Sequence, residues 1–206
     1  MKNKKVCIID YGMGNIHSVY NALATLNCEP VVIHKKEELN NADAFILPGV
    51  GAFPKAINNL SKLHLIEEIK KQVLVKKKNI LGICLGMQLF ANSSEEGGFN
   101  EGLSLVPGKV IDLSKKVKIR VPHIGWNSLK ISNDAKIFNR IPSGQDFYFV
   151  HRYFYQCDSK YILADTEYGI TFTSAIQYNN IYGVQFHPER SHTMGLRLLQ
   201  NFIDLI

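Results

Sequence analysis

A cysteine between two glycines is the clearest candidate for chemistry in this sequence. Cys84 ends the apolar run that begins at Ile80, with Gly82 two residues before it and Gly86 two residues after it. This spacing is the cysteine form of a nucleophile elbow, a strained turn from a strand into a helix that presents a nucleophile. A residue held at positive φ crowds the neighbouring turns, which explains two positions without a Cβ. The pattern predicts that Cys84 is a nucleophile.

The predicted surroundings would also activate the thiol. A helix that begins directly after Cys84 directs unpaired backbone N–H groups and the positive end of its dipole at the sulfur, which favours the thiolate. A cysteine in an apolar run is by itself more often a buried structural residue. The flanking glycines and the preceding strand favour the nucleophile instead.

A thiol nucleophile needs a base, and the base needs a residue that orients it. Of the seven histidines, His187 is the best candidate, because it ends a predicted strand and precedes Pro188 and Glu189. Residues two apart on extended backbone point to the same side, so Glu189 can accept a hydrogen bond from His187. With Cys84, these side chains would form a catalytic triad. A core histidine beside a solvated glutamate is the alternative for this motif alone.

A glycine-rich turn is a candidate oxyanion site. A predicted strand ends at Leu47 and is followed by Pro48, Gly49, Val50 and Gly51. Glycines allow the backbone to turn N–H groups toward a developing oxyanion, and one such donor is worth about 3 kcal/mol of barrier. An ordinary turn is the alternative for these residues alone.

The elements that would position these motifs alternate in the first half of the chain. Short apolar runs predict strands, and a three-and-four spacing of apolar residues predicts helices from Ile16 and over 65–73. The predicted strands are Val6–Ile9, Val31–Ile33, Ala44–Leu47 and Ile80–Ile83. Alternating strands and helices imply a mostly parallel sheet with helices on both faces.

The second half of the chain has a different pattern, with short strand-like segments between turns. These segments lie around Val110, Ile119, Tyr148–Val150, Ile162, Thr171–Ile176 and Ile181–Gln185. Their spacing predicts mixed or antiparallel pairing. A closing helix is predicted from one apolar face formed by Leu196, Leu199, Ile203 and Ile206. We expect a single α/β domain over residues 1–206.

Composition excludes several classes of protein. With 206 residues, 46% hydrophobic and 20% charged, the chain can bury a core and is not of a disordered type. Its longest uncharged apolar stretch, Ile80–Ala91, is shorter than the about 20 residues of a membrane span. Four cysteines without C-x-x-C spacing predict neither zinc binding nor disulfides, and we expect reduced thiols in the cytoplasm. The net charge of +6 comes from short lysine clusters without interleaved aromatics, which favours solubility over nucleic-acid binding.

Taken together, these motifs resemble the class I glutamine amidotransferases, and the resemblance covers the whole chain. Besides the cysteine and histidine motifs at 82–88 and 185–189, five more segments contribute to it. They are Asp10–Asn15, Pro48–Phe53, Pro122–Asn127, Tyr148–His151 and Gly195–Leu199. The combination Gly-Ile-Cys-Leu-Gly-Met-Gln with Gln-Phe-His-Pro-Glu is highly specific for this class.

The resemblance implies a glutaminase. Cys84, deprotonated by His187, would attack the side-chain amide of glutamine, and Glu189 would stabilise the imidazolium. Ammonia would leave, and water would release glutamate from the thioester, with no metal or organic cofactor. The resemblance further implies that backbone amides near Gly51 and Leu85 form the oxyanion hole. The residues that would hold glutamine are Gly51, Gln88, His151 and Arg152.

The resemblance also implies a partner. In the branch of the class that the chain resembles most, the glutaminase pairs as a heterodimer with a (β/α)8-barrel cyclase subunit, which receives the ammonia for an imidazole product in histidine biosynthesis. The expected docking residues are Asn15, His17, Pro122, Trp126 and Asn127. For Trp126 an ordinary buried aromatic is the alternative.

Three positions depart from the family pattern: His17 stands where arginine is usual, Ser104 where glycine is usual, and Arg152 where serine is usual. None belongs to the triad. The departures bear on the partner and the ammonia acceptor, so a glutaminase that supplies a surface-sugar amidation pathway is one alternative. A cysteine hydrolase or peptidase of similar fold and a non-catalytic binding subunit are alternatives from other classes.

Overall fold

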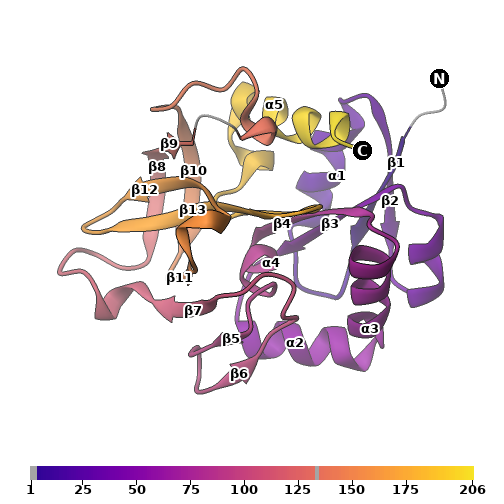
Figure 1. Cartoon of the computed structure of the whole chain (residues 1–206), viewed down its shortest axis with the longest axis horizontal. Helices are drawn as coiled ribbons and strands as arrows, with labels where there is room; N and C mark the ends of the chain where they lie inside the picture. The colour runs from indigo at the N-terminus through magenta and orange to yellow at the C-terminus, as the bar shows by residue number, and fades with distance from the viewer. Residues whose placement is uncertain (1–3, 133–134) are drawn as a thin grey trace.

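The main sheet is parallel in one half. The computed structural model describes residues 4–132 and 135–206, and it contains a 12-stranded sheet and a separate two-stranded sheet (Figure 1). The parallel half has the strand order β2-β1-β3-β4-β14. Its strands are β1 (Lys4–Ile9), β2 (Cys28–Ile33), β3 (Ala44–Gly49), β4 (Asn79–Cys84) and β14 (Ile181–Val184).

The other half of the sheet is mixed. It continues from β14 in the order β13-β11-β7-β5-β6, while β12 joins β13 to β9. Its strands are β5 (Ser93–Ser94), β6 (Asn100–Glu101), β7 (Lys109–Asp112), β9 (Lys130–Ile131), β11 (Tyr153–Gln156), β12 (Ile162–Glu167) and β13 (Thr171–Tyr178). The separate sheet pairs β8 (His123–Ser128) with β10 (Asp146–His151) in antiparallel fashion. A parallel sheet followed by a mixed part confirms the predicted fold class.

Helices cover both faces of the sheet (Figure 1). They are α1 (Ile16–Ala24), α2 (Phe53–Lys62), α3 (Leu65–Lys70), α4 (Leu85–Gln88) and α5 (His192–Asp204). Val6 and Ile8 of β1 face the core under α1 and α5, whereas Cys7 and Ile9 face the core under α2 and α3. This two-residue alternation is what a strand buried on both faces requires.

Three sequence expectations differ from the structure. Ile119 does not lie in a strand, because its side chain packs at the turn around Gly169 without pairing its backbone to a neighbour. Helix α2 and strand β8 were not among the predicted elements. Strand β8 carries a weak signal, because it buries few of its side chains. Helix α2 carries a regular one that was missed: proline in its first turn and apolar Phe53, Ala56 and Leu60 on one face. The helix after Cys84 is only one turn long, so its dipole contributes less than a full helix would.

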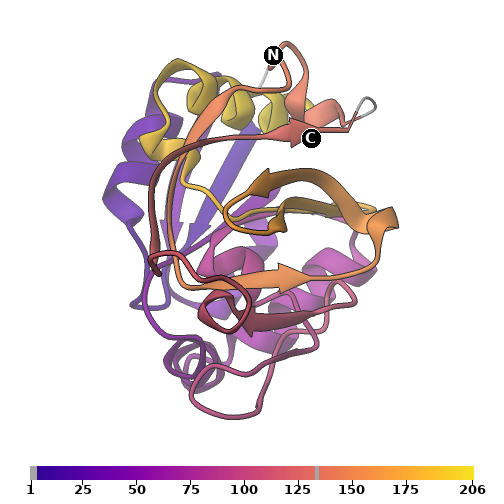
Figure 2. The same ribbon diagram turned by 90° about the vertical axis from the view of Figure 1, so that its left-hand side faces the viewer.

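The carboxyl ends of β1, β3, β4 and β14 meet at one edge of the main sheet. In the register of β3 and β4, Gly49 lies opposite Cys84, so the glycine-rich turn and the predicted elbow are neighbours. The β8–β10 pair runs along this side of the molecule and passes the start of α5 (Figure 2). Parallel α/β sheets bind ligands at such carboxyl ends.

Candidate active site

The turn at Cys84 has the geometry that the glycines predict. Cys84 ends β4 and begins α4 with a φ of 54° and a ψ of −110°. A Cβ on Gly86 would collide with the carbonyl oxygen of Leu47, and a Cβ on Gly82 would approach the backbone nitrogen of Met87 to 2.7 Å. Only glycine at both positions allows the elbow, and this expectation from the sequence is confirmed.

His187 lies beside the thiol and is held on several sides. Its Nδ1 is 2.8 Å from Oε1 of Glu189, and the two side chains are 3% and 1% exposed. Its backbone N–H donates to the carbonyl of Tyr148, and its own carbonyl accepts from the hydroxyl of Ser191. Among the described residues, Nε2 of His187 has no hydrogen-bond partner. That nitrogen is therefore available to exchange a proton with Cys84.

The charge around His187 favours its protonated form. Burial lowers the pKa of His187, but the sulfur of Cys84 and the carboxylate of Glu189 outweigh burial and raise the pKa to about 10. A raised pKa makes the imidazole of His187 a stronger proton acceptor, which suits it to take the proton of the Cys84 thiol.

Two glutamine side chains position the sulfur. Nε2 of Gln185 donates to Sγ of Cys84 at 3.6 Å, and Nε2 of Gln88 donates to Oε1 of Gln185 at 3.0 Å and to the carbonyl of Tyr153 at 2.8 Å. Gln88 has thus used both amide protons, which leaves its Oε1 to accept a bond from a ligand. The role of Gln185 was missed from the sequence, although it belongs to the histidine motif.

A pocket of about 460 Å³ opens over the thiol. It is lined by Val50, Gly51, Cys84, Leu85, Gln88, Glu96, Pro122, Val150, His151, Arg152, Tyr153 and Arg190. The residues predicted for the oxyanion hole and for glutamine binding are all among them. A larger hollow of about 690 Å³ lies against α5, but its lining has no cysteine or histidine, so the chemistry points to the smaller pocket.

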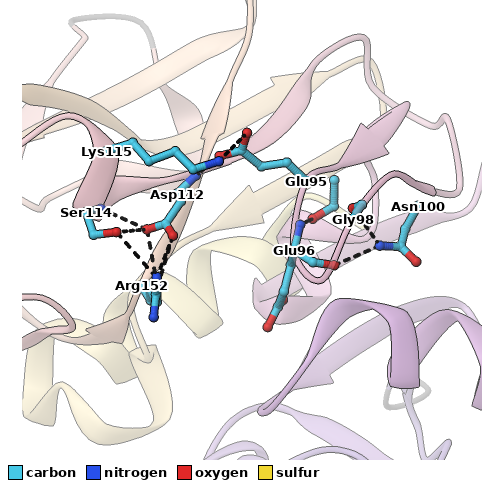
Figure 3. A network of polar contacts seen from close by, with 9 residues as sticks. Glu95, Glu96, Gly98, Asn100, Asp112, Ser114, Lys115 and Arg152 are labelled. Atoms are coloured by element: carbon cyan, nitrogen blue, oxygen red, sulfur yellow. Dashed lines mark hydrogen bonds and ion pairs between the residues drawn. The ribbon is translucent and has the colours of Figure 1, made fainter.

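Two opposite charges line this pocket. Nη2 of Arg152 donates to Oδ2 of Asp112 at 2.7 Å (Figure 3). The carboxylate of Glu96 accepts from the backbone N–H of Phe53 at 2.9 Å. Burial opposes the charge of Asp112, but Arg152 and Ser114 lower the pKa of that carboxyl to about 2. Asp112 thus fixes the cation, and Glu96 supplies the anion. Glu96 was missed from the sequence, where it follows another glutamate in a short polar loop.

A chain of hydrogen bonds links the pocket to the surface strand β8. Nδ1 of His151 is 3.0 Å from the carbonyl of Tyr153, and its Nε2 is 3.0 Å from Nδ1 of His123. Nδ2 of Asn127 lies 3.3 Å from Nε2 of His123 and also donates to the carbonyl of Glu167. Because a carbonyl can only accept, His151 donates to Tyr153, His123 donates to His151, and Asn127 donates to His123. The donor and the acceptor of each hydrogen bond in this series are therefore fixed.

His123 and His151, the two histidines of this series of hydrogen bonds, are neutral. Burial lowers the pKa of His123 to about 4, and burial together with the charge of His123 lowers the pKa of His151 to about 3. These values lie below the unfolded value of about 6.5, so each ring contributes stability above pH about 6.5 that is lost as the pH falls toward 4.

We therefore predict a stability that falls with acidification. Between pH about 6.5 and 4, each of the two histidines should lower the free energy of unfolding by about 1 kcal/mol per pH unit. His123→Phe keeps the aromatic stacking on Phe149 and Tyr168 but removes one titrating ring. Urea unfolding at pH 7, 6 and 5 should show a shallower slope for this variant. An equal slope would mean that His123 is already protonated in the fold.

The predicted docking residues are placed at one side of the pocket, with differing exposure. Trp126 is 47% exposed and stacks on His192 at a ring distance of 4.9 Å, so the interpretation as a buried aromatic is wrong. Pro122 and His17 are exposed, whereas Asn15 and Asn127 are partly buried. Ile124, which the sequence did not single out, is 58% exposed on the same strand as Trp126.

The structure places all three departures from the family pattern. Arg152 lies in the pocket, as described above, and His17 is exposed on α1. Ser104 has a φ of 52° in an exposed turn outside the pocket lining. Its positive φ explains why glycine suits that position.

In residues 4–132 and 135–206, no group of three or more His, Cys, Asp or Glu side chains is arranged to hold a metal ion. Over the same residues, no helix combines the length and apolar character that crossing a membrane requires.

Comparisons with known proteins agree with this geometry. The model of the class-I glutamine amidotransferase family matches residues 7–205. Imidazole glycerol phosphate synthase subunit HisH 1 of Campylobacter jejuni is 42% identical over 97% of this chain and 100% of its own length. Subunit HisH 2 of Vibrio vulnificus is 44% identical over 98% of this chain and 95% of its own length.

Solved structures share the fold at lower identity. The structure of PurLQS from Thermotoga maritima matches with a TM-score of 0.76 and 19% identity over 99% of each chain. A glutamine amidotransferase from the same organism matches with a TM-score of 0.64 and 19% identity over 100% of this chain and 84% of that chain. At such identity the structures support the fold, and the relatives above support the family. The chain belongs to the class I glutamine amidotransferase family, in its HisH branch.

Proposed function

We propose that this chain is a glutaminase domain that hydrolyses L-glutamine to glutamate and ammonia. The observation that carries the proposal is Cys84 at positive φ in the elbow, beside a His187 whose Nε2 has no hydrogen-bond partner in the part of the chain that the structure describes. Glu189 orients His187 through Nδ1. These residues act as nucleophile, base and orienting carboxylate.

The reaction follows from this arrangement. The sulfur of Cys84 attacks the side-chain carbonyl carbon of glutamine, and the oxyanion that forms is stabilised by backbone N–H groups near Gly51 and Leu85. His187 gives its proton to the departing nitrogen, so that ammonia leaves and a thioester remains. His187 then takes a proton from water, which attacks the thioester and releases glutamate. No metal or cofactor takes part in these steps.

The charges of the pocket suit a free amino acid. Glu96 is placed to bind the α-ammonium group of glutamine, and the guanidinium of Arg152 is placed to bind its α-carboxylate. Gly51, Gln88 and the backbone segment around His151, whose two ring nitrogens are already bonded, complete the glutamine site. A glutamine inside a peptide has neither terminal charge, so this pair of residues argues against a peptidase.

We predict that Glu96→Gln raises KM for glutamine about tenfold with little change in kcat, because it removes a charged contact made equally before and during the reaction. Steady-state glutamate formation over a range of glutamine concentrations measures both constants. Glu101→Gln is the matched control, since Glu101 is exposed on β6 and lies outside the pocket lining. An unchanged KM in Glu96→Gln would remove Glu96 from the glutamine site.

For the partner, we propose a heterodimer with a (β/α)8-barrel cyclase subunit in the cytoplasm, which uses the ammonia in histidine biosynthesis. The relatives support this assignment, since their names describe subunits of imidazole glycerol phosphate synthase. A role in surface-sugar amidation has no such support. The exposed Trp126 and Ile124, together with His17 on α1, supply a docking face beside the pocket.

We predict that glutamine hydrolysis by the isolated chain is slow and rises at least about tenfold with the barrel partner, which corresponds to a barrier lowered by about 1.4 kcal/mol.

Trp126→Ala should weaken the binding of the barrel partner by about 2 kcal/mol, as expected for an exposed aromatic that becomes buried in an interface. Titration calorimetry measures the affinity, and Tyr178→Ala, an exposed aromatic on β13, is the control. Full turnover without the partner would contradict the coupling, and equal affinities for both variants would contradict the docking face.

A further inference from the structure

The hydroxyl of Tyr11 is buried without a partner. Tyr11 follows β1 and is 1% exposed, and among the described residues its Oη makes no hydrogen bond. Its backbone is held, because the amide of Asn59 donates to the Tyr11 carbonyl at 3.0 Å. An unpaired buried hydroxyl costs about 1–3 kcal/mol, so its retention in a well-packed core calls for an explanation.

This hydroxyl lies where the glycine-rich turn meets the elbow. A Cβ on Gly49 would come within 2.6 Å of Tyr11 Oη, 2.8 Å of Leu85 Cβ and 2.9 Å of Gly86 N. Gly49 is thus packed between the Tyr11 hydroxyl and the start of α4 after Cys84, with no room for a side chain. Burial, and then the charges of Cys84 and Asp10, raise the pKa of Tyr11, so the phenol stays protonated and can donate.

Tyr11 approaches the turn from the buried side, opposite the pocket. Val50 is 42% exposed and lines the pocket, whereas Gly49 is buried. Met13, two residues after Tyr11, lies behind Gly51, where a Cβ would come within 2.9 Å of Met13 Cε. Gly51 itself has a φ of 102°, a conformation open to glycine. The turn therefore has a tyrosine and a methionine behind it and the substrate pocket in front.

A donor in this place selects one orientation of the turn. In a trans peptide the carbonyl and the N–H point in opposite directions. If a carbonyl of the turn points back to the Tyr11 hydroxyl, the N–H of the same peptide points forward to the pocket, where the oxyanion on the Cys84 adduct forms. A bond made only in that state lowers the barrier without tightening the binding of glutamine.

We propose that Tyr11 is a positioning residue for glutamine hydrolysis, whose hydroxyl donates to a backbone carbonyl of Gly49–Gly51 when the tetrahedral intermediate forms. It thereby holds a backbone N–H of this segment toward the oxyanion. The inference rests on the proposed glutaminase function. It accounts for an unpaired hydroxyl in the resting fold as a donor that is used during turnover.

The test compares two buried tyrosines in the full chain, alone and with its barrel partner. Tyr155 is 0% exposed and its hydroxyl donates to the carbonyl of Val106 at 2.7 Å, outside the pocket lining. Tyr11→Phe should lower kcat about 10- to 100-fold, leave KM within about twofold and leave Tm equal or higher. Tyr155→Phe should do the reverse, lowering Tm and leaving kcat unchanged, because it removes a bond already made in the fold.

The outcomes separate this inference from the function on which it rests. An active wild-type protein with an equally active Tyr11→Phe variant overturns the inference alone. A Tyr11→Phe variant that loses as much Tm as Tyr155→Phe also overturns it, because the hydroxyl would then be bonded in the resting fold. A wild-type protein that releases no glutamate with its partner rejects the glutaminase itself, and the role of Tyr11 with it.

Discussion

Replacing Cys84 by alanine should abolish glutamine hydrolysis while the protein stays folded. The substitution removes the sulfur in the pocket that forms the thioester, so the rate should fall at least about 10⁴-fold. It removes little volume, and it leaves Gln185 Nε2 without the sulfur that accepts its bond, which costs about 1 kcal/mol. Glutamate release measures the first effect, and thermal unfolding measures the second.

The control for this variant is a cysteine of similar burial outside the pocket. Cys28 is 8% exposed, belongs to β2 and bonds weakly to the carbonyl of Leu23. Cys28→Ala should retain full hydrolysis. Cys84→Ala should also keep its affinity for the barrel partner. Loss of the fold in Cys84→Ala would instead assign Cys84 a structural role, the alternative that its apolar surroundings left open.

Replacing Gly86 by alanine should destabilise the fold and end catalysis together. The added Cβ would collide with the Leu47 carbonyl, which belongs to β3 and is fixed in the central sheet. Backbone on both sides must shift, so we expect a loss of about 3 kcal/mol or more in the free energy of unfolding. Urea unfolding and glutamate release, measured on the same preparation, test both effects.

Gly98→Ala is the control that separates the steric collision at Gly86 from the loss of stability that any replacement of glycine at positive φ causes. Gly98 has a φ of 110° and no atom within 4 Å of an added Cβ, so only backbone strain of about 1 kcal/mol is expected there. Its hydrolysis should be unchanged. If Gly86→Ala were no less stable than Gly98→Ala, the tight packing of the elbow against β3 would not hold.

The chemistry of the site could be predicted where residue type alone determines geometry. Two glycines around Cys84 have one common explanation, a crowded backbone, and the structure has that crowding at Gly82 and Gly86. His187 and Glu189 are close in sequence, so extended backbone sufficed to place them together. The parallel half of the sheet was predictable because its buried strands are continuous apolar runs.

Residues that reach the site through long-range packing could not be predicted. Glu96 enters the pocket from a polar loop after β5, and no local pattern distinguishes it from Glu95. Strand β8 escaped prediction because it pairs only with β10 and exposes Ile124 and Trp126, so its hydrophobic pattern is reversed. Tyr11 belongs to a turn motif, and its relation to Gly49 depends on the pairing of β1 with β3.

The exposed side chains of β8 belong to a different sheet from the reacting groups. The nucleophile, its base and the oxyanion turn follow β4, β14 and β3 of one ladder, whereas Ile124 and Trp126 belong to the small β8–β10 ladder. Exposed side chains of β8 can therefore diversify without disturbing the spacing of the reacting groups. An ancestral enzyme with this layout could acquire a new acceptor protein for its ammonia through substitutions at the exposed positions of one surface strand, while the residues of its reaction centre stayed the same.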